Sequence, residues 1–280
     1  MVLRILPKLN RELEDPRYFQ ILFLGSFLLY GILELSWDIT WEKVVLILLS
    51  ALVTQVLFAL IYGKSLHSIK SALITALGLS LLLHVDQIWV GALAACLAIS
   101  SKFLIRLKGK HIFNPANFGI ILSIVLTSQS WVSPGQWGSN TILLFFIGSA
   151  GLMMILKVGR IDTAFAFIGT YALLRFAYVV LYLGWSTDVW IHQMLNGTLL
   201  LFTFFMITDP MTTPNHKKAR WIWSLILAVV VFVASIHFYI QDAAVWALFG
   251  ISLFTPLFDR IYQGSKFHWI TEKEIKTSIS

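Results

Sequence analysis

The sequence has few charged residues and almost no cysteine. Asp, Glu, Lys and Arg make up 12% of the 280 residues, about half the share in a soluble domain, whereas hydrophobic residues make up 58%. A soluble fold of this length could not bury so much apolar surface, which excludes an ordinary soluble enzyme, a disordered chain and a disulfide-rich secreted scaffold. The single cysteine, Cys96, excludes an intramolecular disulfide, and it cannot alone supply a Cys-ligated zinc site or an iron–sulfur cluster.

Common enzyme motifs are also missing. The chain has no Gly-rich phosphate loop, no H-E-x-x-H and no G-x-S-x-G. The net charge of +7 does not predict a nucleic-acid partner, because the basic residues lie in short loops between apolar runs. This pattern is typical of a multi-pass membrane protein, whose first partner is the lipid bilayer.

Ten apolar runs follow one another along the chain. They are Phe19–Ser36, Val44–Tyr62, Ser71–Leu83, Ile88–Leu104, Phe118–Thr127, Thr141–Leu156, Thr163–Leu183, Leu195–Ile207, Trp221–Ile240 and Ala243–Phe258. A full membrane span needs about 20 residues. The third, fifth and eighth runs are too short to cross alone, so they must be extended by flanking residues or be broken helices inside a bundle.

The positions of lysine and arginine predict the topology. With ten spans and the N-terminus inside, 19 of the 21 basic residues fall on the inner side; only Lys43 lies outside, and Arg175 lies within a span. Because basic residues accumulate in cytoplasmic loops, both termini are predicted to be cytoplasmic. We expect one membrane domain over residues 1–280, with halves at about 18–128 and 141–258 and cytoplasmic tails at 1–17 and 259–280.

The ten runs divide into five plus five. Duplication of a five-helix unit gives two halves of inverted topology, and a shortened third run occurs in each half. We therefore predict an all-α integral membrane protein of about ten transmembrane helices, arranged as two inverted five-helix repeats with short or broken third helices.

Two polar segments adjoin the short runs. The first, residues 113–119, enters the fifth run and carries Asn114 and Asn117 around a proline. It predicts either a ligand site or a plain helix start, with Asn114 as the N-cap. The second, residues 208–214, leaves the eighth run and carries Asp209 with Thr208, Thr212 and Thr213. It predicts either hydroxyl and carboxylate groups at a cavity or a turn whose Asp209 faces water.

Both polar segments are expected on the cytoplasmic side, in opposite halves, so they can converge on one cavity. Charges within spans usually face the interior of a bundle, and this makes Arg175 and Glu34 further candidates. Glu34 lies near the outer end of its run, where it could instead reach the membrane interface.

Three stretches in this order resemble a known family. They are FNPANFG at 113–119, GRIDTAFAFIGTYALL at 159–174 and NGTLLLFTFFMITDPMTTP at 196–214. The chain resembles the RnfD/NqrB family, whose members are membrane subunits of the Rnf electron-transport complex and of the sodium-translocating NADH:quinone reductase. The resemblance implies a ten-helix inverted repeat in a bacterial inner membrane, an electron-transport setting with other membrane redox subunits or a homo-oligomer, and flavin binding.

One departure concerns the flavin. Flavinylated members of this family carry FMN on the threonine of an S-G-A-T type motif, in an outer loop after the fifth span. Here that loop, Ser128–Asn140, contains no threonine, so covalent FMN is not expected. Its SPGQWG segment is similar to short relatives of the UnbU type. The resemblance leaves a noncovalent flavin, riboflavin or FMN, with Asn114, Asn117, Thr208, Asp209, Thr212 and Thr213 at its polar edge and Phe113 and Phe118 stacking on its ring.

Two functions follow from these observations. The first is an electron-transport component that binds a flavin noncovalently and is linked to ion or electron movement across the membrane. The second is a transporter or channel for a small solute, such as a flavin or a secondary metabolite, because inverted repeats with broken helices also serve carriers. At most, the chain is a non-catalytic or redox subunit of a membrane oxidoreductase, and no metal site is expected.

Overall fold

The protein is mainly helical. The computed structural model describes residues 15–35, 37, 39–63, 68–132 and 141–267. The predicted tails before residue 15 and after residue 267, and loop residues 133–140, lie outside the described residues. In the N-terminal half the helices are α2 (Pro16–Leu33), α3 (Trp41–Ile61), α4 (Ile69–Leu82), α5 (Ile88–Leu104) and α6 (Pro115–Thr127).

The C-terminal half contains more broken helices than the first. Its helices are α7 (Thr141–Val158), α8 (Ile161–Phe176), η2 (Ala177–Tyr182), α9 (Thr187–Met194), α10 (Gly197–Leu201), η3 (Phe202–Met206), α11 (Lys217–His237), α12 (Ala243–Ser252) and α13 (Thr255–Ile261). The segments η2 and η3 are π-helical turns that continue α8 and α10. Such turns are rare and are frequently found at functional sites.

Two small antiparallel ladders join the helices, and the apolar pattern did not predict them. Strand β1 (Leu83–Val85) pairs with β4 (Ser130–Val132), and β2 (Arg106–Leu107) pairs with β3 (Lys110–His111). The β2–β3 ladder is a tight hairpin between α5 and α6. The end of the molecule at which it lies is called the hairpin end below.

Every predicted apolar run coincides with a helix or with a bent pair of helices. Among the described residues, four helices are long and apolar enough to cross a membrane, and the number rises to six if each of two bent pairs is one span. The other four runs fall in apolar helices of 10–17 residues. Of the shortened third runs, α4 is continuous, whereas α9 and the helix after it are bent by 50°.

Local sequence signals explain where these helices begin. Asp15 caps α2 by accepting the backbone N–H of Arg17, and Pro16 occupies the first turn, where its missing N–H costs nothing. Asn196 caps α10 by accepting the N–H of Thr198 at 2.9 Å, so a new helix starts directly after α9 ends. This cap positions the break in the eighth run.

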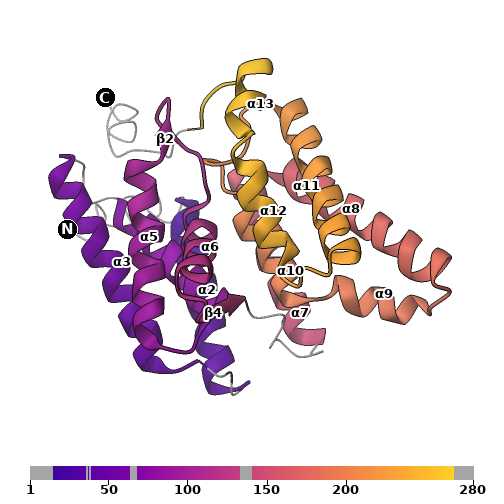
Figure 1. The fold of residues 1–280 in the computed structure, drawn as a ribbon, viewed down its shortest axis with the longest axis horizontal. Coiled ribbons are helices and arrows are strands. Elements are labelled where there is room, and N and C mark those ends of the chain that lie inside the picture. The colour runs from indigo at the N-terminus through magenta and orange to yellow at the C-terminus, as the bar shows by residue number, and fades with distance from the viewer. Residues whose placement is uncertain (1–14, 36, 38, 64–67, 133–140, 268–280) are drawn as a thin grey trace, which may run out of the picture.

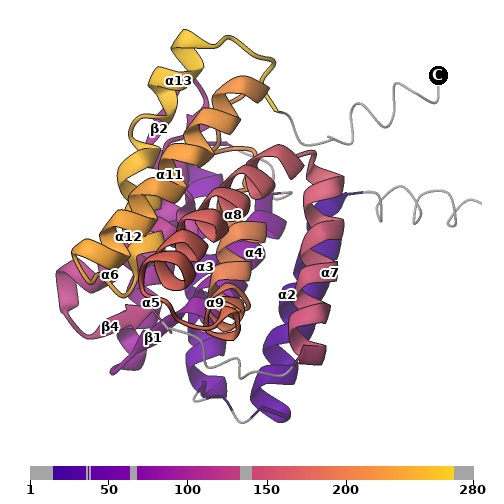
Figure 2. The ribbon, with the colours of Figure 1, turned by 90° about the vertical axis from the view of Figure 1, so that its right-hand side faces the viewer.

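The same helix pairs pack together in each half. In the first half, α4 contacts α2 and α3, α3 contacts α5, and α5 contacts α6. In the second half, the α10–η3 segment contacts α7, and η3 contacts α8, which packs on α11, and α11 contacts α12. The halves lie side by side in Figure 1 and meet where α2 contacts α7 and α6 contacts α12. Figure 2 shows that α2 and α7 run in opposite directions.

A close backbone approach fixes the α5–α6 contact. A Cβ atom on Gly119 would lie 2.5 Å from the Ala94 carbonyl oxygen and 2.8 Å from the Ala98 Cβ. Both alanines are fully buried in α5. Only glycine fits at this position, so the sequence that follows Asn114 is held against the core of the first half.

Charged loops collect at the hairpin end. The carboxylate of Asp15 contacts Lys70 at 3.1 Å, and Asp259, near the end of α13, contacts Lys110 of the hairpin at 2.7 Å. In Figure 2 the start of α2, the β2–β3 hairpin and α13 all lie toward the upper end, whereas β1 and β4 lie at the lower end. Segments that the charge pattern assigns to one side are therefore neighbours in space.

Candidate functional site

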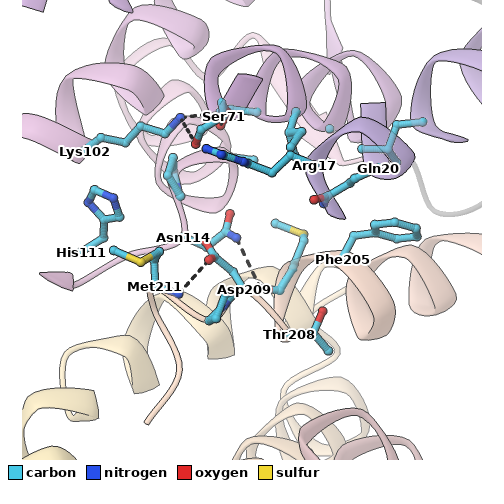
Figure 3. A pocket seen from close by; sticks show the side chains of 18 of the residues that line it. Arg17, Gln20, Ser71, Lys102, His111, Asn114, Phe205, Thr208, Asp209 and Met211 are labelled. Carbon is cyan, nitrogen blue, oxygen red and sulfur yellow. Dashed lines mark hydrogen bonds between the residues drawn. The ribbon is translucent and has the colours of Figure 1, made fainter. Parts of the chain in front are cut away.

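A cavity of about 260 Å³ lies between the two halves, near the hairpin end. Its wall is made by α2 to α7, by α10 and η3, and by the turn that follows η3 (Figure 3). The polar side chains that line it are Arg17, Gln20, Gln55, Ser68, Ser71, Thr75, Lys102, Arg106, His111, Asn114, Thr208 and Asp209. Leucine, isoleucine, methionine and phenylalanine side chains line its deeper part, so the cavity is polar at one end and apolar at the other.

Asn114 reaches the cavity from the start of α6. Its Oδ1 atom accepts the backbone N–H of Asn117 at 3.2 Å, which makes Asn114 the N-cap of the helix. Its Nδ2 atom donates to the carbonyl oxygen of Met206 at 3.3 Å, at the end of η3. Asn114 therefore caps one half and contacts the other, and the two interpretations of its sequence both hold.

Asp209 reaches the same cavity from the turn after η3. The backbone carbonyl of Asp209 accepts the N–H groups of Thr212 and Thr213, each at 3.1 Å, and the carboxylate accepts the N–H of Met211 at 2.9 Å. This turn holds the carboxylate toward the cavity (Figure 3). Thr208 also lines the cavity, while its hydroxyl donates to the Phe204 carbonyl at 2.5 Å.

Burial raises the pKa of Asp209. The hydrogen bond from the Met211 N–H and the charges of Lys102, Arg160 and Lys110 act in the opposite direction, but burial dominates. No ion pair reaches the Asp209 carboxylate within the described part of the chain. A carboxylate in this state can accept a hydrogen bond from a ligand or exchange a proton with one.

The other predicted site residues lie outside the cavity lining. Asn117 is buried and donates to the Val245 carbonyl in α12 at 2.9 Å. Phe113 and Phe118 pack with Phe249, also in α12, at ring-centre distances of 4.7 and 6.1 Å. These three residues hold α6 against α12.

The two threonines that end the turn support its shape. The hydroxyls of Thr212 and Thr213 both donate to the Asp209 carbonyl, at 3.3 and 3.0 Å. Thr213 Oγ1 also accepts a hydrogen bond from the Arg160 guanidinium at 3.3 Å. Neither threonine lines the cavity.

The two charges predicted within spans are remote from the cavity. Arg175, in α8, donates to the side-chain oxygen of Gln193, in α9, at 3.1 and 2.5 Å. Glu34 is exposed at the C-terminal end of α2. Neither side chain lines the cavity.

Several cavity residues were not predicted from the sequence. Lys102, in the last turn of α5, is only 6% exposed, and its ammonium group donates to the carbonyl oxygen and the hydroxyl of Ser71 at 2.9 and 3.0 Å. Gln55 projects from α3, is 2% exposed, and donates to Ser68 at 2.7 Å. A glutamine in the middle of an apolar run was the only signal that could have identified this wall.

A comparison with protein families supports the sequence resemblance. Residues 123–268, just over half of the chain, match the model of the NQR2, RnfD, RnfE family. The matched range includes the turn that carries Asp209 and begins after the Asn114 segment.

Individual relatives carry one shared description. The chain is 28% identical to the RnfD subunit of the ion-translocating oxidoreductase complex of Halorhodospira halophila over 138 residues, 49% of this chain and 36% of that protein. It is 23% identical to the protein of the same description from Alcanivorax borkumensis over 296 aligned positions, 82% of this chain and 86% of that protein. It is 28% identical to the one from Shewanella pealeana over 147 residues, 51% of this chain and 41% of that protein.

The family match agrees with the architecture, because several apolar helices make the chain a multi-pass membrane protein. The turn that holds Asp209 in the cavity lies within the matched residues. The chain is a member of the NQR2, RnfD, RnfE family.

Proposed function

We propose that this protein is a membrane component of an electron-transport system that translocates ions, and that it binds a flavin noncovalently in the cavity between its halves. The relatives are described as RnfD subunits of an ion-translocating oxidoreductase complex, which supports a role beside other membrane redox subunits. A bound flavin would supply one- and two-electron chemistry, while the protein tunes it through hydrogen bonds and burial.

The observation that carries this proposal is the polar lining of a buried cavity. Asn114 and Lys102 supply donors there, and Asp209 supplies an acceptor. Within the described residues, the Oε1 atom of Gln55 is buried and has no hydrogen-bond partner. A buried acceptor without a partner costs free energy, and an N–H or O–H group of a ligand would remove that cost. Flavins have both acceptors and donors along one ring edge and hydroxyls on the ribityl chain.

The arrangement of the two halves supports the same proposal. Matching helix contacts in each half and the opposite directions of α2 and α7 are what an inverted repeat would produce. We infer that the chain is such a repeat with ten spans, in the inner membrane of a bacterium, and that the hairpin end faces the cytoplasm. Ligand sites in these folds lie between the repeats, next to broken helices.

The direct test is the flavin content of the purified protein. Detergent-solubilised protein should show flavin absorbance, and denaturation should release all of it into solution. A denaturing gel should show no fluorescent band, because the Ser128–Asn140 loop lacks the acceptor threonine. Protein that is colourless, and that does not bind added riboflavin or FMN, would contradict the proposal.

A matched pair of variants locates the site. Gln55→Met should weaken riboflavin binding about threefold to tenfold, the effect of one lost hydrogen bond. Glu34→Gln, at an exposed position outside the cavity, should bind riboflavin like the wild type. Equal affinities of the two variants would place the flavin elsewhere.

A carrier for a small solute is the second candidate. The observation that favours it is the presence of two bent helix pairs, at 50° and 48°, in the half that completes the cavity. Broken helices are common in transporters that alternate between two states. Uptake of a flavin into proteoliposomes, by protein that carries no bound flavin after purification, would favour this function over the first.

A further inference from the structure

Two cationic side chains line the cavity without a carboxylate partner. Lys102 comes from the end of α5, and Arg106 comes from strand β2, four residues later. Among the described residues, no carboxylate lies within ion-pair distance of either one. By contrast, Lys110 and Arg220 contact carboxylates at 2.7 and 2.6 Å.

Both cations have hydrogen-bond capacity to spare. A lysine ammonium group has three N–H donors, and Lys102 directs two of its hydrogen bonds to the carbonyl and hydroxyl oxygens of Ser71. The Nε atom of Arg106 is buried and makes no hydrogen bond within the described part of the chain. One donor on each side chain is therefore available to an acceptor in the cavity.

Membrane topology does not account for Lys102. Basic residues at the cytoplasmic ends of helices usually extend to lipid headgroups and water. Lys102 is 6% exposed and points to Ser71 inside the bundle, on the side of the cavity opposite Asn114 and Asp209 (Figure 3). A buried charge of this kind is costly unless a counter-charge is supplied.

We propose that the ligand of this cavity carries an anionic group, a phosphate or a carboxylate, that binds to Lys102 and Arg106. The inference rests on the proposed function and makes it more specific, because it selects a flavin phosphate over neutral riboflavin. The phosphate would lie on the Lys102 side, while the carboxylate of Asp209 accepts hydrogen bonds from the uncharged part of the ligand. A phosphate monoester carries close to two negative charges at neutral pH and has three strong acceptor oxygens.

The test compares two probes that differ only in the phosphate. Flavin-depleted full-length protein in detergent is titrated with FMN and with riboflavin, and binding is followed by flavin fluorescence. Wild-type protein should bind FMN at least about tenfold more tightly than riboflavin, and added salt should reduce this preference. Equal affinities for the two probes would overturn the proposal.

Three variants identify the residues responsible. Lys102→Met and Arg106→Gln should each remove most of the preference for FMN and change riboflavin affinity less than about threefold. Arg106 is partly exposed in the hairpin, so its variant should fold even if Lys102→Met does not. Lys108→Asn is the matched control, because Lys108 is an exposed cation of the same hairpin, has a positive φ of 51° that asparagine tolerates, and does not line the cavity.

Inorganic phosphate separates this inference from the proposed function. If the flavin phosphate occupies the site, inorganic phosphate should compete with FMN and leave riboflavin binding unchanged. If neither flavin binds, the proposed flavin function is wrong, and phosphate alone then decides the inference. A rise in the unfolding temperature of the wild type with phosphate that is lost in Arg106→Gln would support an anion site; equal shifts or no shift would overturn it.

Discussion

Replacement of Asp209 by asparagine should separate ligand binding from stability. Asparagine keeps the side-chain oxygen that accepts the Met211 N–H at 2.9 Å, so the turn after η3 should retain its shape. The variant removes only the negative charge that lines the cavity. A hydrogen bond to a charged acceptor contributes about 1.5–3 kcal/mol, so riboflavin binding should weaken about tenfold to 150-fold.

Stability should change in the opposite direction and should depend on pH. Burial raises the pKa of Asp209, so the folded state favours the neutral acid. Its stabilising contribution is complete below the ordinary carboxyl range, near pH 4, and is lost as the pH rises through the raised value. The variant has no such loss. Its unfolding temperature should therefore exceed that of the wild type at pH 7, and the difference should shrink as the pH approaches 4.

Two further variants complete the design. Asp209→Ala should lose the same riboflavin affinity and, in addition, about 1 kcal/mol of stability from the missing hydrogen bond to Met211. Asp259→Asn removes a carboxylate that contacts Lys110 outside the cavity, so it should reduce stability and leave riboflavin binding unchanged. Riboflavin is the right probe because it lacks a phosphate.

The measurements are riboflavin titration and thermal unfolding in detergent between about pH 4 and pH 8. Wild-type riboflavin affinity in Asp209→Asn would refute the assignment of Asp209 to the ligand site. A stability difference that is the same at both ends of the pH range would refute the argument from its raised pKa.

Three other predictions follow from packing, charge and topology. Gly119→Ala should destabilise the protein by about 1–3 kcal/mol through its clash with α5, whereas Gly25→Ala, with nothing near its Cβ position, should be neutral or stabilising in thermal unfolding. Burial opposes ionisation of Asp15, but its arginine and lysine partners keep its pKa below the usual range, so Asp15→Asn should lower the unfolding temperature at pH 7 and lose this effect as the pH falls below about 4. In a cysteine-free background, Asp86→Cys and Lys108→Cys should react with an impermeant thiol reagent from opposite sides of the membrane, and reaction from one side would contradict the ten-span topology.

Much of the fold could be predicted because its determinants are local. Apolar runs set the helices, and residues such as Asp15 and Asn196 mark their starts by capping. The bend in the tenth run was not predicted, although Pro256 lies in the first turn of α13, because proline at that position is equally compatible with a helix start. The β1–β4 ladder was not predicted because it pairs segments that are 47 positions apart at Leu83 and Ser130, and no local pattern encodes such pairing.

The candidate site was predicted on one side only. Asn114, Thr208 and Asp209 attracted attention because amides, hydroxyls and a carboxylate interrupt apolar sequence beside prolines. Lys102 did not, because a lysine at the end of an apolar run has the same sequence pattern whether it extends to water or points into the bundle. Only the packing of α5 against α4, which brings Lys102 to Ser71, distinguishes the two.

This asymmetry has a physical origin in where the cavity lies. One wall comes from the second half, where η3 ends and the backbone turns at Asp209, and turns require residues that are conspicuous in sequence. The opposite wall comes from the sides of regular helices, where Gln55 and Lys102 replace single apolar residues without disturbing the backbone. The turn can hold its carboxylate rigidly through its own hydrogen bonds, whereas Lys102 depends on a neighbouring helix. Ligand specificity should therefore vary more readily through the helical wall, and ligand loss should follow most directly from damage to the turn.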